Sequence, residues 1–263
     1  MTELLHERVG PIVTLTIHRP EAYNALHSKL LDELVAAVAE SAVDPAVRAV
    51  VITGSGVKAF SAGADLKELA DMGLARSRAV MAAGQRAFRT IEALPIPVVA
   101  AVNGLALGGG FELVLASTFP ILSERASLGL PESALGLIPG YGGTQRLPRA
   151  VGQRVAAHLM LTGSRLDAAR AYELGLTPVP PVVPDKLMAV ASDVAFMIAD
   201  QGPQAVRSIL QALEIGRDAP LDAGLTAETD LAASAIAGEE SAEGISAFLG
   251  KRPARFSQRK GCR

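Results

Sequence analysis

Several segments in the first half of this chain have the patterns of hydrophobic and polar residues that are typical of β-strands. Residues 11–18 (PIVTLTIH) alternate apolar and polar side chains, as a half-buried strand does. Residues 47–53 (VRAVVIT) form an apolar, β-branched run typical of a buried strand. Residues 97–102 (PVVAAV) and 119–122 are two further strand candidates. These segments predict a largely buried sheet.

Helical spacing of apolar residues occurs between these strands and dominates the second half. Ser28 is the predicted N-cap of a first helix, which ends at Asp44-Pro45, and residues 76–93 form an amphipathic second helix. A proline-rich connection occupies residues 175–184. The later predicted helices span 151–161, 167–174, 185–200, 203–215, 221–236 and 240–249. The pattern indicates an α/β core followed by a helical C-terminal region.

One uncharged stretch, residues 93–111, is long enough to raise the question of a membrane segment. It contains two prolines and four glycines, so we interpret it as a strand, a turn and the start of a helix. The N-terminus is charged where a signal peptide would be apolar. The single cysteine, Cys262, allows no intrachain disulfide, which fits a reducing compartment. We therefore expect a cytoplasmic protein that binds no membrane.

The composition is that of a folded domain, because 49% of the 263 residues are hydrophobic and the formal net charge is only -2. A near-neutral chain is a poor candidate for a dedicated duplex-DNA binder. The charge is unevenly placed, however. Residues 251–263 hold six basic side chains and no acid, so the rest of the chain carries 19 basic and 27 acidic groups. The sequence thus describes an acidic body with a basic tail.

Several common catalytic motifs are absent from the sequence. No GxGxxG follows a predicted strand, and neither the Walker motif nor the GxSxG nucleophile elbow occurs. The four histidines, His6, His18, His27 and His158, lack the spacing of metal ligands. We therefore expect no metal site and no Ser/His/Asp or Cys/His catalysis.

Three glycine-rich turns carry the remaining candidates for chemistry. They lie at 61–65 (SAGAD), 103–112 (NGLALGGGFE) and 131–147 (PESALGLIPGYGGTQRL). A turn between a strand and a helix leaves backbone N–H groups free to bind an anion, and two such groups make an oxyanion hole. A pair of glutamates beside it would serve general acid and base catalysis. Taken singly, each turn is also explained by tight packing or by a glutamate that complements a helix dipole.

Together and in this order, the three turns resemble the enoyl-CoA hydratase/isomerase (crotonase) superfamily. The resemblance covers about residues 11–256 and includes HRPEAYNAL near the start and AEGISAFLGKRPARF near the end. It implies an α/β fold, a crotonase-like spiral of ββα turns with a helical C-terminal trimerisation region. Residues 1–200 would form the core with the acyl-CoA site, 201–256 the helical region, and 257–263 a disordered basic tail. A homotrimer or a dimer of trimers is implied.

The resemblance also implies a mechanism. The backbone N–H groups of Ala64 and Gly109 would hold the thioester oxygen, Glu112 would activate a water molecule, and Glu132 would protonate C2. The product of such water addition to a 2-enoyl-CoA is a 3-hydroxyacyl-CoA. Isomerases of the family usually keep only the second glutamate, so the presence of both favours a hydratase. No cofactor is implied beyond the coenzyme A of the substrate.

The same resemblance assigns residues around the substrate. Coenzyme A would contact the backbone of Ala62 and the side chains of Lys67, Phe248 and Lys251. The predicted acyl pocket contains Leu69, Met72, Gly140 and Tyr141. Solvated surface lysines and simple core filling are the alternatives for these positions. We expect Tyr141 to narrow the pocket rather than face solvent.

Three other functions stay open at this point. The chain could be a 3,2-enoyl-CoA isomerase, or a specialised hydratase for branched, aromatic or carnitine-type thioesters. An RNA-binding homologue is a third possibility, because residues 73–90 hold four arginines and no acid. Such a helix is more typical of a solvated face or an oligomer contact. Ser117 and Thr118 replace a Cys-Asp pair found in many members, which we interpret as structural variation.

Overall fold

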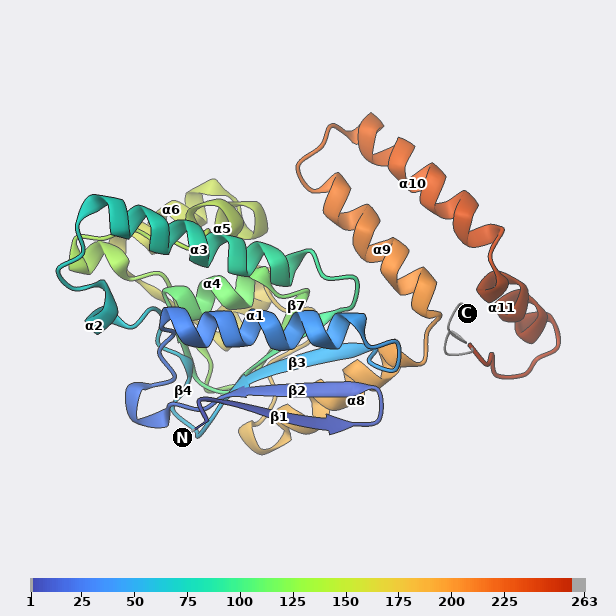
Figure 1. Cartoon of the computed structure of the whole chain (residues 1–263), viewed down its shortest axis with the longest axis horizontal. Coiled ribbons are helices and arrows are strands. Elements are labelled where there is room, and N and C mark those ends of the chain that lie inside the picture. Colours follow the sequence, from blue (N-terminus) through green and yellow to red (C-terminus); the bar gives the residue numbers. More distant parts are fainter. Residues whose placement is uncertain (1, 257–263) are drawn as a thin grey trace.

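Parallel pairing of buried strands forms the main sheet of the protein (Figure 1). The computed structural model describes residues 2–256, so Cys262 and the predicted tail at 257–263 lie outside the described residues. The sheet order is β1-β2-β3-β5-β7, with only β1 antiparallel to its neighbour. The strands are β1 (Leu4–Val9), β2 (Ile12–Ile17), β3 (Ala49–Gly54), β5 (Val98–Val102) and β7 (Phe119–Leu122).

A second sheet consists of short strands in the order β4-β6-β8-β9. They are β4 (Ala59–Ser61), β6 (Leu105–Leu107), β8 (Ser127–Gly129) and β9 (Arg165–Asp167). Three times along the chain, a long strand of the main sheet is followed by a short strand of the second sheet and then by a helical segment. This repeated ββα order agrees with the spiral expected from the sequence.

Helices cover both faces of the main sheet. The helices are α1 (Ser28–Val43), α2 (Leu66–Leu69), α3 (Leu74–Glu92), α4 (Gly109–Ala116), α5 (Gly143–Val151), α6 (Gln153–Thr162), α7 (Ala168–Glu173), α8 (Leu187–Ala199), α9 (Pro203–Gly216), α10 (Leu221–Ile236) and α11 (Glu239–Leu249), with 3-10 turns η1 (Pro20–Ala22), η2 (Glu132–Leu135) and η3 (Pro184–Lys186). Val50 and Ile52 of β3 pack into the core that includes α1, α3 and α4, whereas Ala49 and Val51 pack against α8. Burial on both faces explains why this strand is an unbroken apolar run.

The predicted strands and helices recur with small shifts at their ends, and three kinds of difference have physical causes. Strand β1 was not predicted because five of its six residues are exposed and LLHERV shows no alternation of apolar and polar side chains. The short strands of the second sheet are too brief to show a period. The predicted N-cap at Ser28 is wrong. Ser28 is the first helical residue, and the Nδ1 atom of His27 accepts the hydrogen bond from the Leu30 N–H instead.

The last three helices, α9 to α11, extend away from the sheet and its covering helices (Figure 1). Among their residues, Ala247 alone is buried within one chain. Their exposed apolar side chains include Ile209, Leu213, Leu221, Leu225, Ile236, Ile245, Phe248 and Leu249. Within residues 2–256, no helix combines the length and the apolar character needed to cross a bilayer.

Candidate active site

The three glycine-rich turns meet around one cavity of about 680 Å³. Of the predicted site residues, those that line this cavity are Ala62, Ala64, Leu69, Met72, Gly109, Glu112, Glu132, Gly140 and Tyr141. Its lining combines backbone and carboxylate groups with apolar side chains such as Leu66 and Met81. Such a cavity suits a mostly apolar ligand with one polar reacting group.

The backbone N–H groups of Ala64 and Gly109 lie close together in the wall of this cavity. A methyl group built on Gly109 would stand 3.3 Å from the Ala64 nitrogen. Gly109 is the first residue of α4, where a backbone N–H has no intrahelical acceptor. Among residues 2–256, neither N–H donates a hydrogen bond to the protein. Two free donors are thus available to one ligand oxygen.

Glycine is required where the two turns approach each other. Gly63 has φ +100, and a Cβ there would stand 2.7 Å from the Leu107 carbonyl oxygen and 3.0 Å from the Gly109 nitrogen. Gly108 has φ +49, and its Cβ would lie 2.9 Å from Oε1 of Glu132. Both positions combine left-handed backbone with a close contact, so only glycine fits.

The turn that carries Ala64 is held by the segment around residues 19–26. The Leu26 N–H donates to the Gly63 carbonyl, and the Asp65 N–H donates to the Leu26 carbonyl. Arg19 forms an ion pair with Asp65 at 3.0 Å. These contacts give the HRPEAYNAL segment of the sequence a structural role next to the cavity.

Glu112 lies on α4 and is 1% exposed. Its Oε1 atom accepts hydrogen bonds from the backbone N–H of Tyr141 at 2.8 Å and of Gly143 at 2.7 Å. Burial raises the pKa of this carboxyl to about 7, although the Gly143 N–H opposes the shift, and the nearby Glu132 adds to it. A carboxyl with this pKa exchanges its proton near neutral pH.

Glu132 is the first residue of η2, three residues after β8 ends at Gly129. Its Oε2 atom is buried and has no hydrogen-bond partner among the described residues. Burial raises the pKa of this carboxyl above its ordinary value, against the effect of its own backbone N–H. The site therefore pairs one anchored carboxyl with one whose buried oxygen is free.

Tyr141 is buried and lines the cavity, so its ring does not face solvent. Its ring meets Phe88 edge to face, with 5.4 Å between the centroids. It also lies against Gly84, where any side chain would overlap the ring. Burial raises the pKa of its hydroxyl to about 12, so the group stays protonated.

The residues predicted to contact coenzyme A lie farther apart in the structure than the predicted catalytic residues do. Ala62 is exposed at the edge of the cavity, and Lys67 is exposed on α2. Phe248 is 83% exposed near the end of α11, close to Lys251. Figure 1 shows α11 and α2 at opposite ends of the molecule. Within one chain, Phe248 and Lys251 therefore do not reach the cavity.

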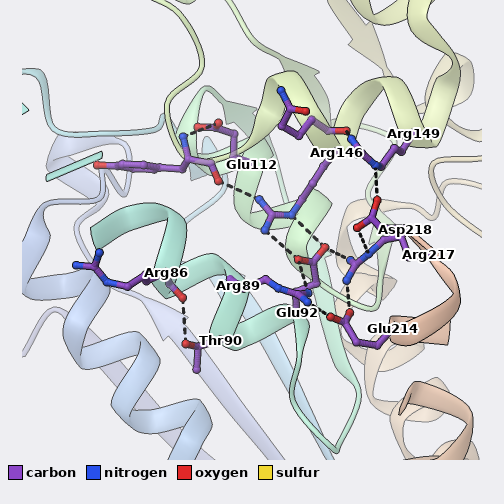
Figure 2. Close-up of polar contacts among 12 residues, drawn as sticks. Arg86, Arg89, Thr90, Glu92, Glu112, Arg146, Arg149, Glu214, Arg217 and Asp218 are labelled. Carbon is purple, nitrogen blue, oxygen red and sulfur yellow. Dashed lines mark hydrogen bonds and ion pairs between the residues drawn. The ribbon is translucent and has the colours of Figure 1, made fainter. Parts of the chain in front are cut away.

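A charged cluster beside the cavity was not identified from the sequence. Arg146 of α5 pairs with Glu92 of α3 at 2.9 Å, and Arg89 and Arg217 also bind Glu92 (Figure 2). Arg146 stands in the GGTQRL motif, but Glu92 and Arg217 are far from it in the sequence. Contacts between residues this far apart in the sequence leave no spacing pattern by which they could be predicted.

Two other observations complete the site. Ser117 donates to the Val114 carbonyl, and the Thr118 hydroxyl accepts from the Val98 N–H, so both residues act in local structure at the end of α4. In the described part of the chain, no group of three or more His, Cys, Asp or Glu side chains is arranged to hold a metal ion.

Comparison with known proteins places this geometry in context. The profile of the Enoyl-CoA hydratase/isomerase family matches residues 7–259. The crotonyl-CoA hydratase of Syntrophomonas wolfei is 40% identical over 253 residues, which are 96% of this chain and 97% of that protein. The 2,3-dehydroadipyl-CoA hydratase of Escherichia coli is 40% identical, with 98% and 100% covered. A crystal structure of an enoyl-CoA hydratase from Bacillus anthracis has a TM-score of 0.94 at 39% identity, with 98% and 100% covered.

Proposed function

The chain belongs to the enoyl-CoA hydratase/isomerase family, and we propose that it is an enoyl-CoA hydratase, a lyase that adds water to 2-enoyl-CoA thioesters. The observation that carries this proposal is the pair Glu112 and Glu132 at one cavity, beside the free N–H groups of Ala64 and Gly109. The relatives named above as hydratases support the same reaction. The product is the 3-hydroxyacyl-CoA.

The backbone stabilises the charge that develops during the reaction. The thioester oxygen accepts hydrogen bonds from Ala64 and Gly109 as water adds to C3 and negative charge moves onto that oxygen. The dipole of α4, whose N-terminus is at Gly109, favours the same charge. Because these donors are already in place, their orientation costs nothing at the moment of reaction.

The two glutamates divide the proton transfers. Ionised Glu112 takes a proton from the water as its oxygen bonds to C3, and protonated Glu132 gives a proton to C2. One carboxyl gains the proton and the other loses it, so the charge of the pair is conserved. Burial raises the pKa of both carboxyls, which favours a pair that shares one proton, and the pKa of Glu112 near 7 leaves a base available at neutral pH.

Isomerisation of 3-enoyl-CoA thioesters is the competing reaction for the same oxyanion hole. We expect hydration of 2-enoyl-CoA to dominate, because isomerisation needs no second carboxylate to activate water. The purified protein would be assayed with 2-enoyl-CoA and 3-enoyl-CoA substrates of several chain lengths, including branched and aromatic ones. Isomerisation faster than hydration for every chain length would reject the proposed reaction.

We propose a homotrimer or a dimer of trimers, the assembly implied by the family resemblance, and the exposed apolar faces of α9 to α11 support it. A single chain leaves Leu213, Leu221, Ile236 and Phe248 in contact with water, which is unfavourable for a stable monomer. In an assembly, Phe248 and Lys251 of one subunit would reach the coenzyme A bound by a neighbour. Sedimentation equilibrium of the full chain is expected to give the mass of three or six chains, and a monomer would contradict this assembly.

A further inference from the structure

We propose that the ion pair between Glu92 and Arg146 positions the general base Glu112, by fixing the loop whose backbone N–H groups hold that carboxylate. This inference rests on the proposed function for its kinetic readout. Neither residue touches the catalytic cavity itself. Both act through the loop at residues 139–143, which we call the clamp loop.

Glu112 is oriented by the clamp loop and not by another side chain. Its hydrogen-bond partners in the described part of the chain are the N–H groups of Tyr141 and Gly143, both to Oε1. The loop contains Gly140 and Gly142, and Gly142 has φ +114. A loop this rich in glycine has little stiffness of its own, so its geometry must come from contacts with its surroundings.

Arg146 supplies such a contact from the opposite side of the loop. Its Nη1 donates to the Tyr141 carbonyl at 2.9 Å, while its Nε and Nη2 donate to the Glu92 carboxylate at 3.1 and 2.9 Å. Tyr141 is thereby held through both its N–H, on Glu112, and its carbonyl, on Arg146. The space that Gly142 leaves is filled by the Arg146 guanidinium. Gln85 of α3 adds a bond to the Gly140 carbonyl at 2.9 Å.

Glu92 is in turn a rigid anchor. Figure 2 shows its carboxylate between Arg146, Arg89 and Arg217, and the side chains of Glu92 and Arg146 are only 12% and 15% exposed. Burial opposes ionisation of Glu92, but the hydrogen bond and charge of Arg146 and the charges of the other arginines outweigh it and lower the pKa. The bidentate Arg146–Glu92 pair therefore stays charged and fixed in direction across the working pH range.

Loss of Arg146 is expected to raise the pKa of Glu112. The charged or titratable groups that face Glu112 are Glu132 from η2, Arg146 from α5 and Tyr141 from the clamp loop. From α3, Glu92 faces Arg146 rather than Glu112. Without Arg146, a positive charge is lost and the two N–H donors loosen. Both changes disfavour the carboxylate, so the pKa of Glu112 rises further.

The first test is kinetic and uses Arg146→Met in the full chain, with Arg149→Met as the matched control. Arg149 is on the same helix but pairs with exposed Asp218 and does not touch the clamp loop. We expect Arg146→Met to lower kcat by about 10- to 100-fold, with KM little changed, because a base displaced by a fraction of an ångström loses its alignment. The acid limb of the kcat/KM profile should move to higher pH. Arg149→Met should match the parent protein.

Two more conservative variants distinguish the effect of the geometry of Arg146 from that of its charge. They also test the proposal if Arg146→Met fails to fold. Arg146→Lys keeps the charge but loses the planar fork, so its acid limb should stay near that of the parent while kcat remains low. Glu92→Gln removes the anchor's charge and should lower kcat in the same direction. Equal kcat and equal acid limbs for Arg146→Met, Arg146→Lys and Arg149→Met would overturn the proposal.

A second readout does not depend on activity. Because its pKa is raised on folding, ionised Glu112 costs stability as pH rises from its ordinary 4.5 to about 7. The difference in thermal midpoint between Glu112→Gln and the parent should therefore grow over this range and then level off. In the Arg146→Met background it should continue to grow at higher pH, and an unchanged curve would contradict the proposed role. A parent protein without hydratase activity would reject the proposed function alone.

Discussion

Replacing Glu112 or Glu132 by glutamine is expected to lower kcat for hydration of crotonyl-CoA by about 10²- to 10⁴-fold, the usual contribution of a positioned acid or base. Glutamine at 112 still accepts the N–H groups of Tyr141 and Gly143 through its Oε1, so the fold should persist. Glutamine at 132 keeps the size of the side chain but has no acidic proton for C2. The loss of the enoyl thioester absorbance measures the rate.

The pH dependence of kcat/KM tests whether Glu112 is the general base. For the parent protein, kcat/KM should fall as pH drops through about 7, because the Glu112 carboxylate becomes protonated there. Glu132 carries its proton in the reactive form, so glutamine at 132 removes no charge beside Glu112. The acid limb of the residual Glu132→Gln activity should therefore stay near that of the parent protein. In Glu112→Gln this limb should be absent.

A matched control is Glu173→Gln, which changes an exposed glutamate whose one ion-pair partner within residues 2–256 is neighbouring Arg170. It should leave kcat and the pH profile unchanged. Near-full hydration by either active-site variant would remove the role assigned to that glutamate. Loss of activity in Glu132→Gln alone, with Glu112→Gln still fast on 3-enoyl-CoA, would point to the isomerase instead.

Gly109→Ala is expected to lower kcat/KM by about 10²- to 10³-fold, the cost of removing one oxyanion donor. The new methyl group would lie 3.3 Å from the Ala64 nitrogen and 3.2 Å from Cδ2 of Tyr141. It would therefore occupy the space in which the thioester oxygen meets its two donors. Alanine is a better helix former than glycine, so the first turn of α4 should not be weakened. Steady-state kinetics with the same substrate measure the effect.

The control for this variant is Gly224→Ala within α10. A methyl group there would meet its nearest neighbour, the Cα of Gly216, at an ordinary 3.5 Å, and the cavity is not involved. Its kinetics should equal those of the parent protein. If Gly109→Ala were also fully active, the N–H groups of Ala64 and Gly109 would not be the donors for the thioester.

The central elements of the fold were predictable because burial leaves a pattern in the residues. The apolar run at 47–53 became β3, and the apolar spacing beyond residue 200 became α9 to α11. The strand at Leu4–Val9 was not predicted because most of its residues are exposed, so no alternating apolar pattern marks it as a strand. The short strands of the second sheet were missed because three residues cannot display a period.

The sequence by itself determined the family resemblance, the three glycine-rich turns and the candidate glutamates at 112 and 132. Such features are local, since glycine marks positive φ or close approach wherever it stands. Only the tertiary structure decided that Glu112 is held by the backbone of Tyr141 and Gly143, and that Glu92, Arg146 and Arg217 converge behind that loop. Those contacts join segments tens of residues apart, and their energies depend on burial and direction. Spacing along the chain carries no record of either quantity.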